Sequence, residues 1–559
     1  MIDLAQVSAE RLMAHTRTLA RWERWSGSAE ELEAARYVAA ELTAMGYATQ
    51  LILHDAYIGL PGPASLRVTA PAPREIFCIT HPGTVPTGPE GVRGELVDAG
   101  KGSAEGFVAA GAAGKIALVE GRARSHVALA ATRAGVKGLI CFGTPHAQEM
   151  SCAVPWGNPS ESTVSMQPAV HVVSVHREDG LALRKQCAEG RVEAHFTAEV
   201  REGWTKTPVV IADLPPAHPE ADAEIFVFFT GHLDSWYVGA MDNGGANAAM
   251  LECARLLAPG RARFRRGLRV AFWSGHSHGR YSSSAWYADN FWFALDRHCA
   301  VNVNVDSIGA HGADRFRTWT MTETADLVRR AVRQVAGADI EIGRVARAYD
   351  ESFWGIGIPS MLNGLSWQED GGIGWWQHTP YDTVDRMDPA RLARDTRIYL
   401  LVLDRLLTDA VLPFDYAASA ADIKVQLEDL QRAGQGRFDL APAVEAAAHL
   451  ERLCGGLNER VSAATGDLAR ARALNACLVD LGRILIPATY HASGRFAHDP
   501  ALPTAFLPKL QPVRRLAAQP PESDRARLIT VDLVRARNEV LHALRQAARR
   551  VESCLTAGM

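Results

Sequence analysis

The sequence predicts an α/β fold: a mostly parallel, mixed sheet flanked by helices, with a β-rich insertion and a helical C-terminal part. Three observations predict it. Between about 206 and 415, apolar runs such as IFVFFTG alternate with helical patterns, which is the rhythm of a parallel sheet. Residues 58–205 are rich in Gly, Pro and short β-like runs. After about 416 the strand patterns end, and helical patterns continue to the C-terminus.

Length and composition exclude several classes of protein. The 559 residues are too many for one domain. With 59 basic and 63 acidic residues the net charge is −4, so charge gives no reason to expect nucleic acid or a membrane as partner. Nine scattered cysteines without a CxxC pair disfavour a disulfide framework and a thiolate zinc site. The charged N-terminus lacks the apolar core of a signal peptide, and no stretch could span a membrane. We expect a soluble, cytoplasmic protein.

The first 50 residues are predicted to be helical. In EELEAARYVAAELTAMGY, residues Ala35, Val38 and Leu42 share one face, and Gly46 ends the helix. In the β-rich part, KIALVEG (115–121) and VKGLICFG (136–143) are predicted strands on either side of a short helix. We therefore predict one discontinuous domain of residues 1–57 and 206–415, interrupted by an inserted domain at 58–205.

The second half of the discontinuous domain carries the alternating pattern. Strands are predicted at 225–231, 268–275 and 300–306, with a helix at 247–257. The first strand is apolar throughout, as expected of a strand buried on both faces. Ligands of such sheets bind at the carboxyl ends of the strands, so the residues that follow these strands are the candidate site.

Residues 416–559 are predicted to form a helical domain. In its last helix, six apolar residues make one stripe: Leu533, Val540, Leu544, Ala547, Val551 and Leu555. Packing within the chain and a dimer face both explain such a stripe, and both interpretations stay open.

Histidines and aspartates follow all three predicted strands and recur in one later loop. Seven of them form the candidate site: His232, Asp234, Asp242, His276, His278, Asp306 and His378. Imidazoles and carboxylates together suit zinc and similar metals. Asp234 stands where it can orient His232 through the second ring nitrogen, and Asp242 where it can bridge two ions. Taken singly, each residue is also compatible with a capping or loop hydrogen bond.

Several segments resemble the zinc aminopeptidase / glutamate carboxypeptidase family of metallopeptidases. Three signatures are similar to GHLDSWYVGAMDNGGANAAMLECARLL, VNVNVDSIG and QHTPYDTVDRMD. The segments GELVDAGKGS, GKIALVEG and PAVHVVSVHREDG resemble the protease-associated domain that such enzymes carry as an insertion. The helical C-terminal part is similar to the dimerisation domain of the transferrin-receptor-like branch. The resemblance thus implies a zinc-peptidase-like fold, an inserted protease-associated domain at 58–205, a helical dimerisation domain at 416–559 and a homodimer.

The resemblance also implies one or two divalent ions, with zinc the expected metal. Carried over to this sequence, one ion is held by His232, Asp242 and Asp306. Asp242 bridges to a second ion that His378 binds, and Asp234 supports His232.

One departure from the family pattern bears on mechanism. Two adjacent glutamates of the family, a general base and a metal ligand, are His276 and Ser277 in this chain. Three interpretations stay open: a two-ion site with an added imidazole from His276 or His278, a one-ion site with a histidine base, or a relic without catalysis. Glu351, Glu369 and Asp370, in the loops before His378, are candidates to replace the missing carboxylate, with solvated loop positions as the alternative.

We expect a metal-dependent hydrolase that attacks a peptide or related amide bond with activated water. His276, His278 and Asp234 are the candidate catalytic residues, and a small peptide or amide is the expected partner. Tryptophans near the site are candidates for an apolar substrate wall or for core packing: Trp236, Trp354, Trp367, Trp375 and Trp376. Hydrolysis of a small non-peptide amide or C–N bond is the first alternative function. A non-catalytic binding protein on a peptidase fold is the second.

Overall fold

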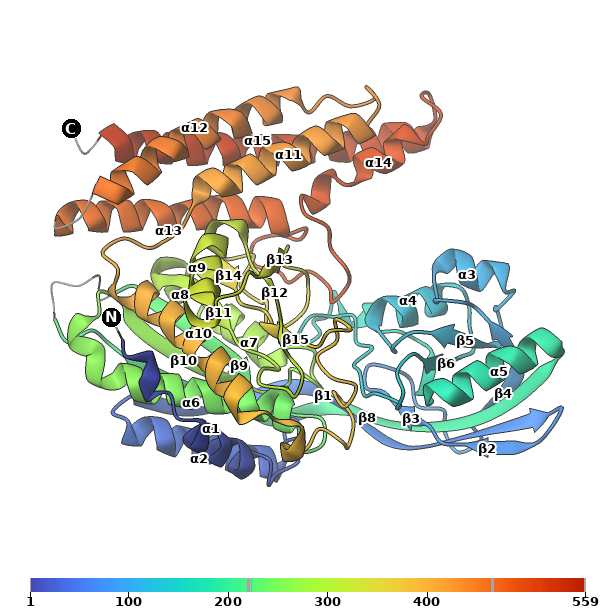
Figure 1. Ribbon diagram of the computed structural model, residues 1–559. Helices are drawn as coiled ribbons and strands as arrows, with labels where there is room; N and C mark the ends of the chain where they lie inside the picture. The colour runs from blue at the N-terminus through green and yellow to red at the C-terminus, as the bar shows by residue number, and fades with distance from the viewer. Residues whose placement is uncertain (1, 219–221, 223, 464–466, 557–559) are drawn as a thin grey trace.

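The computed structural model describes residues 2–218, 222, 224–463 and 467–556 (Figure 1). Its centre is a 12-stranded sheet in the order β14-β11-β9-β10-β8-β4-β5-β6-β7-β3, with β1 paired to β8 and β2 paired to β1. Its strands are β1 (Ala48–Ala70), β2 (Arg74–Ile76), β3 (Ile79–Thr80), β4 (Val92–Asp98), β5 (Ile116–Glu120), β6 (Gly138–Phe142), β7 (His171–Ser174), β8 (Val192–Leu214), β9 (Phe226–His232), β10 (Gly267–Trp273), β11 (Cys299–Asn304) and β14 (Ser360–Met361). A small second sheet contains β12 (Arg315–Trp319), β13 (Glu341–Gly343) and β15 (Ser366–Trp367). The predicted α/β fold is confirmed.

The candidate site lies on the part of the sheet built from β9, β10, β11 and β14, whose neighbouring pairs are all parallel. Successive side chains of β9 point to opposite faces. Val227 and Phe229 join one core with the N-terminal helices, whereas Phe226 and Phe228 join a second core. The helices of this part are α1 (Ala9–Leu19), α2 (Ala29–Ala44), α6 (Ala246–Leu257), α7 (Ser282–Asn290), α8 (Trp292–His298), α9 (Ala325–Ala336) and α10 (Pro389–Thr408). The apolar run predicted as a doubly buried strand is therefore β9.

The start of α2 illustrates how the sequence fixes a helix end. Ser28 caps the helix by accepting a hydrogen bond from the backbone N–H of Glu31. The Glu31 carboxylate in turn accepts from the N–H of Gly27 at 2.7 Å. This reciprocal arrangement satisfies two backbone donors that a helix start otherwise leaves free. It also fixes the chain just after Ser26, which contacts the candidate site.

The β-rich part is joined to the rest through two long strands (Figure 1). β1 and β8 pair antiparallel from Ala48↔Asp213 to Ala70↔Glu193, so they run through both the site-bearing sheet and the inserted sheet. β1 begins at Ala48, before the predicted end of the helical N-terminal segment. The predicted boundaries at 57/58 and 205/206 fall inside these strands, and the division into domains remains a prediction. The inserted part adds α3 (Ala104–Ala109), α4 (Ser125–Arg133) and α5 (Arg177–Glu189), with apolar cores of its own.

The C-terminal helices are α11 (Tyr416–Ala433), α12 (Ala441–Ala463), α13 (Leu468–Tyr490), α14 (Pro512–Ala517) and α15 (Asp524–Thr556). They share one apolar core with the site-bearing part. The predicted stripe of α15 packs into that core, with Leu533, Val540 and Leu544 buried. Packing within the chain therefore accounts for the stripe, and a homodimer remains a prediction. Across the described residues, no helix has the length and hydropathy that crossing a bilayer requires.

Candidate metal centre

The carboxyl ends of the parallel strands bring four of the predicted residues together. His232 ends β9, Asp306 follows β11, and Asp242 lies in a turn, Ala240–Gly245, just before α6. Nε2 of His232 lies 3.1 Å from Oδ1 of Asp242 and 3.8 Å from Oδ2 of Asp306. Nε2 of His378, from a distant loop, lies 2.9 Å from Oδ2 of Asp242. Asp242 thus stands between two imidazoles, one oxygen toward each.

The burial and charge of this cluster suit a divalent cation. His232, Asp242 and Asp306 are buried, and Nε2 of His232 has no hydrogen-bond partner in the described residues. Burial alone would lower the pKa of His232, but Asp234, Asp242 and Asp306 raise it well above its ordinary value. Two imidazole nitrogens and two carboxylates are ligands of the kind that zinc binds in proteins. A cation in the cluster satisfies both the orphaned nitrogen and the carboxylates, so the residues fit the metal that the family resemblance implies.

Asp234 forms hydrogen bonds with several residues around the cluster. Nδ1 of His232 lies 2.8 Å from the backbone oxygen of Asp234 and 3.6 Å from its Oδ1. The carboxylate also accepts hydrogen bonds from the Ser26 hydroxyl at 2.7 Å and from the backbone N–H of Ser277 at 2.9 Å. Burial opposes ionisation, but the imidazoles around it hold the pKa of Asp234 below its ordinary value. The backbone oxygen of Asp234 therefore fixes the His232 ring, and its carboxylate anchors the turn at 276–277.

His278 lies behind Asp234. Its Nδ1 is 3.0 Å from the Ser26 hydroxyl, and its ring packs against Trp25 and Trp236. Burial lowers its pKa to about 4. In the described residues no ion pair joins it to Asp242 or Asp306. The ring is therefore placed to support Asp234 and the loop around it.

His276 does reach the cluster. Its ring stacks on that of His232, with centroids 3.8 Å apart and planes 13° from parallel. Ligand atoms of His232, His276 and Asp306 all lie within 4.8 Å of one another. A metal ion lies close to the plane of each imidazole that binds it, about 2.0–2.1 Å from the nitrogen. Two nearly parallel, stacked rings cannot both satisfy that condition for one ion, so this geometry favours His276 as a neighbour of the ion that His232 binds.

The inserted part holds the last loop of the site. Nδ1 of His378 lies 2.7 Å from the backbone oxygen of Glu149, and the Glu149 N–H donates to the backbone oxygen of His378 at 3.0 Å. The Glu149 side chain is buried beside Tyr237, and burial raises its pKa to about 8. Both Tyr237 and His378 have positive φ, 53° and 59°. Such conformations cost energy in non-glycine residues and persist only where surrounding contacts enforce them.

The sequence did not single out four residues that contact the predicted ones. They are Ser26, Asp350, Gln377 and Asp382. Asp382 accepts hydrogen bonds from the backbone N–H groups of Met241 and Asp242, and burial together with Asp242 raises its pKa to about 7. Asp382 and Gln377 both belong to the QHTPYDT motif, which is the one available signal. The other two, Ser26 and Asp350, come from segments whose contact with the site leaves no local pattern.

The loop acids considered as replacements for the missing carboxylate lie elsewhere. Glu351 is buried and accepts hydrogen bonds from Trp354, Ser360 and Asn363. Glu369 and Asp370 are exposed. The carboxylate that contacts His276 belongs instead to Asp350, whose Oδ2 lies 2.9 Å from Nδ1 of His276.

Most of the candidate aromatic wall is core. Trp354, Trp367 and Trp376 are buried. Trp236 packs against His378, with ring centroids 5.9 Å apart. Trp375 is partly exposed and contacts His146 of the inserted part. Trp375, at the contact with the insertion, is therefore the one tryptophan of this candidate wall with a large exposed surface.

Arginines without carboxylate partners also lie near the cluster. Nη1 of Arg122, from the inserted part, is 3.4 Å from Oε1 of Gln377, whose Nε2 donates to Oδ2 of Asp242 at 3.1 Å. Burial and the neighbouring Arg124 lower the pKa of Arg122 to about 10. Nε of Arg280 is buried without a partner. None of the three guanidinium groups forms an ion pair within the part of the chain that the structure describes.

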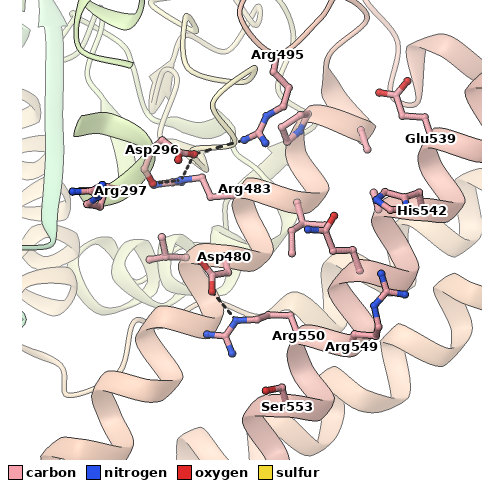
Figure 2. Close-up of a pocket in the computed structure, with 16 residues that line it drawn as sticks. Asp296, Arg297, Asp480, Arg483, Arg495, Glu539, His542, Arg549, Arg550 and Ser553 are labelled. Carbon is pink, nitrogen blue, oxygen red and sulfur yellow. Dashed lines mark hydrogen bonds and ion pairs between the residues drawn. The ribbon is translucent and has the colours of Figure 1, made fainter. Parts of the chain in front are cut away.

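A separate cavity of about 820 Å³ lies between α8, α13 and α15 (Figure 2). Its lining includes Arg297, Arg549 and His542, together with Asp480 paired to Arg550 and Asp296 near Arg483 and Arg495. It contains none of the seven predicted site residues. The hollow therefore belongs to the junction with the helical part and is distinct from the cluster.

Comparison with known proteins identifies the site-bearing part. Residues 209–403 match the model of Peptidase family M28. Aminopeptidase YwaD of Bacillus subtilis is 26% identical over 340 residues, 57% of this chain and 68% of that protein. The probable glutamate carboxypeptidase VP8 of Zea mays is 27% identical over 236 residues, 38% of this chain and 32% of that protein. The chain thus carries a Peptidase family M28 domain, which confirms the family resemblance.

Solved structures share the fold. An aminopeptidase from Aneurinibacillus sp. strain AM-1 has a TM-score of 0.56 and 21% identity, covering 72% of this chain and 95% of that one. A zinc aminopeptidase from Bacillus subtilis has a TM-score of 0.54 and 22% identity, with the same coverage of 72% and 95%. The site-bearing part therefore has the architecture of these aminopeptidases.

Proposed function

We propose that this chain is a metallopeptidase-like hydrolase that cleaves a peptide or related amide bond, with zinc held by His232, Asp242 and Asp306. The Peptidase family M28 domain supports hydrolysis, and the aminopeptidase and probable carboxypeptidase relatives support peptide substrates. A structural neighbour described as a zinc aminopeptidase supports the choice of metal. One observation carries the proposal: the buried, unpartnered Nε2 of His232 faces carboxylates from two other chain segments.

The roles of the residues follow from their contacts. A bound divalent cation supplies Lewis-acid polarisation of the substrate carbonyl and of water. Asp234 keeps the His232 ring directed into the cluster. Hydrolysis adds the oxygen of water to the carbonyl carbon and breaks the C–N bond. The proton that the water gives up goes to Nε2 of His276 and then to the leaving nitrogen.

We propose one tightly held ion. Ser277 offers a neutral hydroxyl where the family resemblance implies a carboxylate ligand, so a second ion would gain less charge compensation. Oδ2 of Asp242 accepts a hydrogen bond from Gln377 at 3.1 Å, which competes with a second ion for the same oxygen. His378 donates from Nδ1 to the backbone oxygen of Glu149, which leaves Nε2 as an acceptor 2.9 Å from Oδ2 of Asp242, where any second, weaker ion would bind.

We propose further that the substrate carries a carboxylate beside the scissile bond. Arg122 reaches the cluster through Gln377, Arg124 and Arg280 lie near Tyr281, and none of the three forms an ion pair in the described residues. Neighbouring guanidinium groups without ion pairs repel one another, so binding of an anion between them is favourable. A carboxylate suits such a site because a guanidinium can bind it through two parallel hydrogen bonds. N-acyl amino acids and peptides with a free carboxyl end fit this chemistry.

The experiment combines metal analysis with a substrate panel. Protein purified after growth with zinc should contain about one ion per chain, and Asp306→Asn should lose it. N-acyl amino acids should be hydrolysed faster than aminoacyl anilides. Metal-free wild-type protein that hydrolyses neither class would support the non-catalytic binding role instead. Activity confined to small non-peptide amides would support the first alternative function.

The inserted part and the helical part enter this proposal as a protease-associated domain and a dimerisation domain. The contact between Glu149 and His378 supports a role of the insertion in completing the site. The expected homodimer is tested by light scattering of the eluted protein, and a monomer at micromolar concentration would contradict it.

A further inference from the structure

The imidazole of His276 is held on three sides, by His232, Asp350 and the nearby Tyr281. One face stacks on His232, and the edge of Tyr281 meets the ring with centroids 4.8 Å apart and planes at 88°. Its Nδ1 lies 2.9 Å from Oδ2 of Asp350. The ring has little freedom to rotate, so the atom that it presents to the cluster is fixed by its surroundings.

We propose that Asp350 is a positioning residue that makes His276 the general base, in place of the carboxylate found in the family. An ionised carboxylate only accepts hydrogen bonds, so the proton between the two groups resides on Nδ1 of His276. In the neutral ring Nε2 then carries the lone pair. In the described residues Nε2 of His276 forms no hydrogen bond, which leaves it free to take a proton. This inference rests on the proposed hydrolase function.

The environment of Asp350 is built for this role. The carboxylate is buried, with 1% of its surface exposed. Its Oδ1 accepts a hydrogen bond from the Ser284 hydroxyl at 2.9 Å, so one oxygen is fixed by α7 and the other faces His276. In the described residues it has no Lys or Arg partner. The free oxygen of this carboxylate is therefore directed at Nδ1 of His276 and is not shared with a cationic side chain of the described residues.

If Asp350 only supported the loop, its loss would lower kcat equally whether the general base is a histidine or a glutamate. The experiment therefore compares Asp350→Asn in both backgrounds. In the wild-type background, Asp350→Asn should lower kcat about 100-fold or more, since a positioned base contributes about 10²–10⁴-fold, with KM changed less than about threefold. In a His276→Glu background, where no tautomer needs fixing, the same Asp350→Asn change should alter kcat less than about threefold. An equal loss in both backgrounds would assign Asp350 a structural role and overturn the proposal.

Two further variants guard against a trivial result. Glu351→Gln is the matched control, because Glu351 is the adjacent buried acid and contacts Trp354, Ser360 and Asn363 instead of His276. It should leave kcat within about threefold. Ser284→Ala loosens Asp350 without removing its charge and should lower kcat by about three- to tenfold. A full-activity Ser284→Ala protein together with an inactive Glu351→Gln protein would contradict the assignment.

A spectroscopic measurement tests the positioning without turnover. In zinc-loaded protein labelled with ¹⁵N-histidine, His276 should show a protonated Nδ1 and an unprotonated Nε2, and Asp350→Asn should mix or reverse the two. If no substrate is cleaved but this signature is present, the hydrolase proposal fails while the positioning of His276 stands. A wild-type ring protonated on Nε2 in its neutral form would refute the positioning itself.

Discussion

Arg122 provides a sharp test of the proposed substrate carboxylate. In the Arg122→Met variant the chain keeps a long, flexible side chain of similar reach but loses the guanidinium near Gln377. A hydrogen bond from a charged donor contributes about 1.5–3 kcal/mol when buried. Arg122 is only half-buried and also feels Asp242, so the lower value applies. A loss of about 1.5 kcal/mol corresponds to roughly a tenfold fall in kcat/KM.

The assay compares an N-acyl amino acid with the same molecule carrying a terminal amide. The variant should lose about tenfold in kcat/KM on the acid and less than about twofold on the amide. Arg133→Met is the matched control, since Arg133 is an exposed arginine of α4 on the same inserted part. It should change neither substrate. An equal loss on acid and amide would show that Arg122 maintains the loop and does not meet a carboxylate.

Three further predictions concern stability and metal. Ser26→Ala removes the 2.7 Å hydrogen bond to Asp234. We therefore expect the free energy of unfolding in urea to fall by about 1–3 kcal/mol. An unchanged urea midpoint would exclude a structural role for this hydrogen bond. Burial raises the pKa of Glu323 from 4.5 to about 7. Because the fold favours the protonated form, the free energy of unfolding of wild-type protein should fall by up to about 3 kcal/mol as pH rises through that window. Glu323→Gln should not show this fall, and parallel stability–pH curves for the two proteins would contradict the prediction. Chelation should lower Tm and added zinc should restore it, but zinc should not raise the Tm of Asp306→Asn to the same extent.

The elements that follow from local pattern could be predicted from the sequence. β9, β10 and β11 are apolar runs bounded by polar segments, and each lies within two residues of its predicted range. β1 and β8 could not be predicted at their full length, because each passes from one core to another and so changes its burial pattern along the strand. Their pairing is a contact between segments more than a hundred residues apart, which no local signal contains.

The candidate site divides in the same way. His232, Asp242 and Asp306 could be singled out because ligands gather where parallel strands end. Asp350 could not, since it faces His276 across 74 residues of sequence and stands beside Glu351, a more conspicuous candidate. The sequence also gives no indication that Glu149 reaches the backbone of His378 from the inserted part. What the sequence lacks is the arrangement of loops, which is set by tertiary packing.

The two long strands that join the parts have a mechanical consequence. A conventional linker would let the inserted part swing freely, but β1 and β8 are hydrogen-bonded along their course, with a register shift between Pro61 and Ala64. Pro61 and Pro63 lack backbone donors, so the ladder is interrupted there, as it is at a second register shift between Val68 and Ala70. The insertion is therefore held against the ligand loop both by this ladder and by direct contacts such as Glu149 with His378 and Trp156 with Ser352.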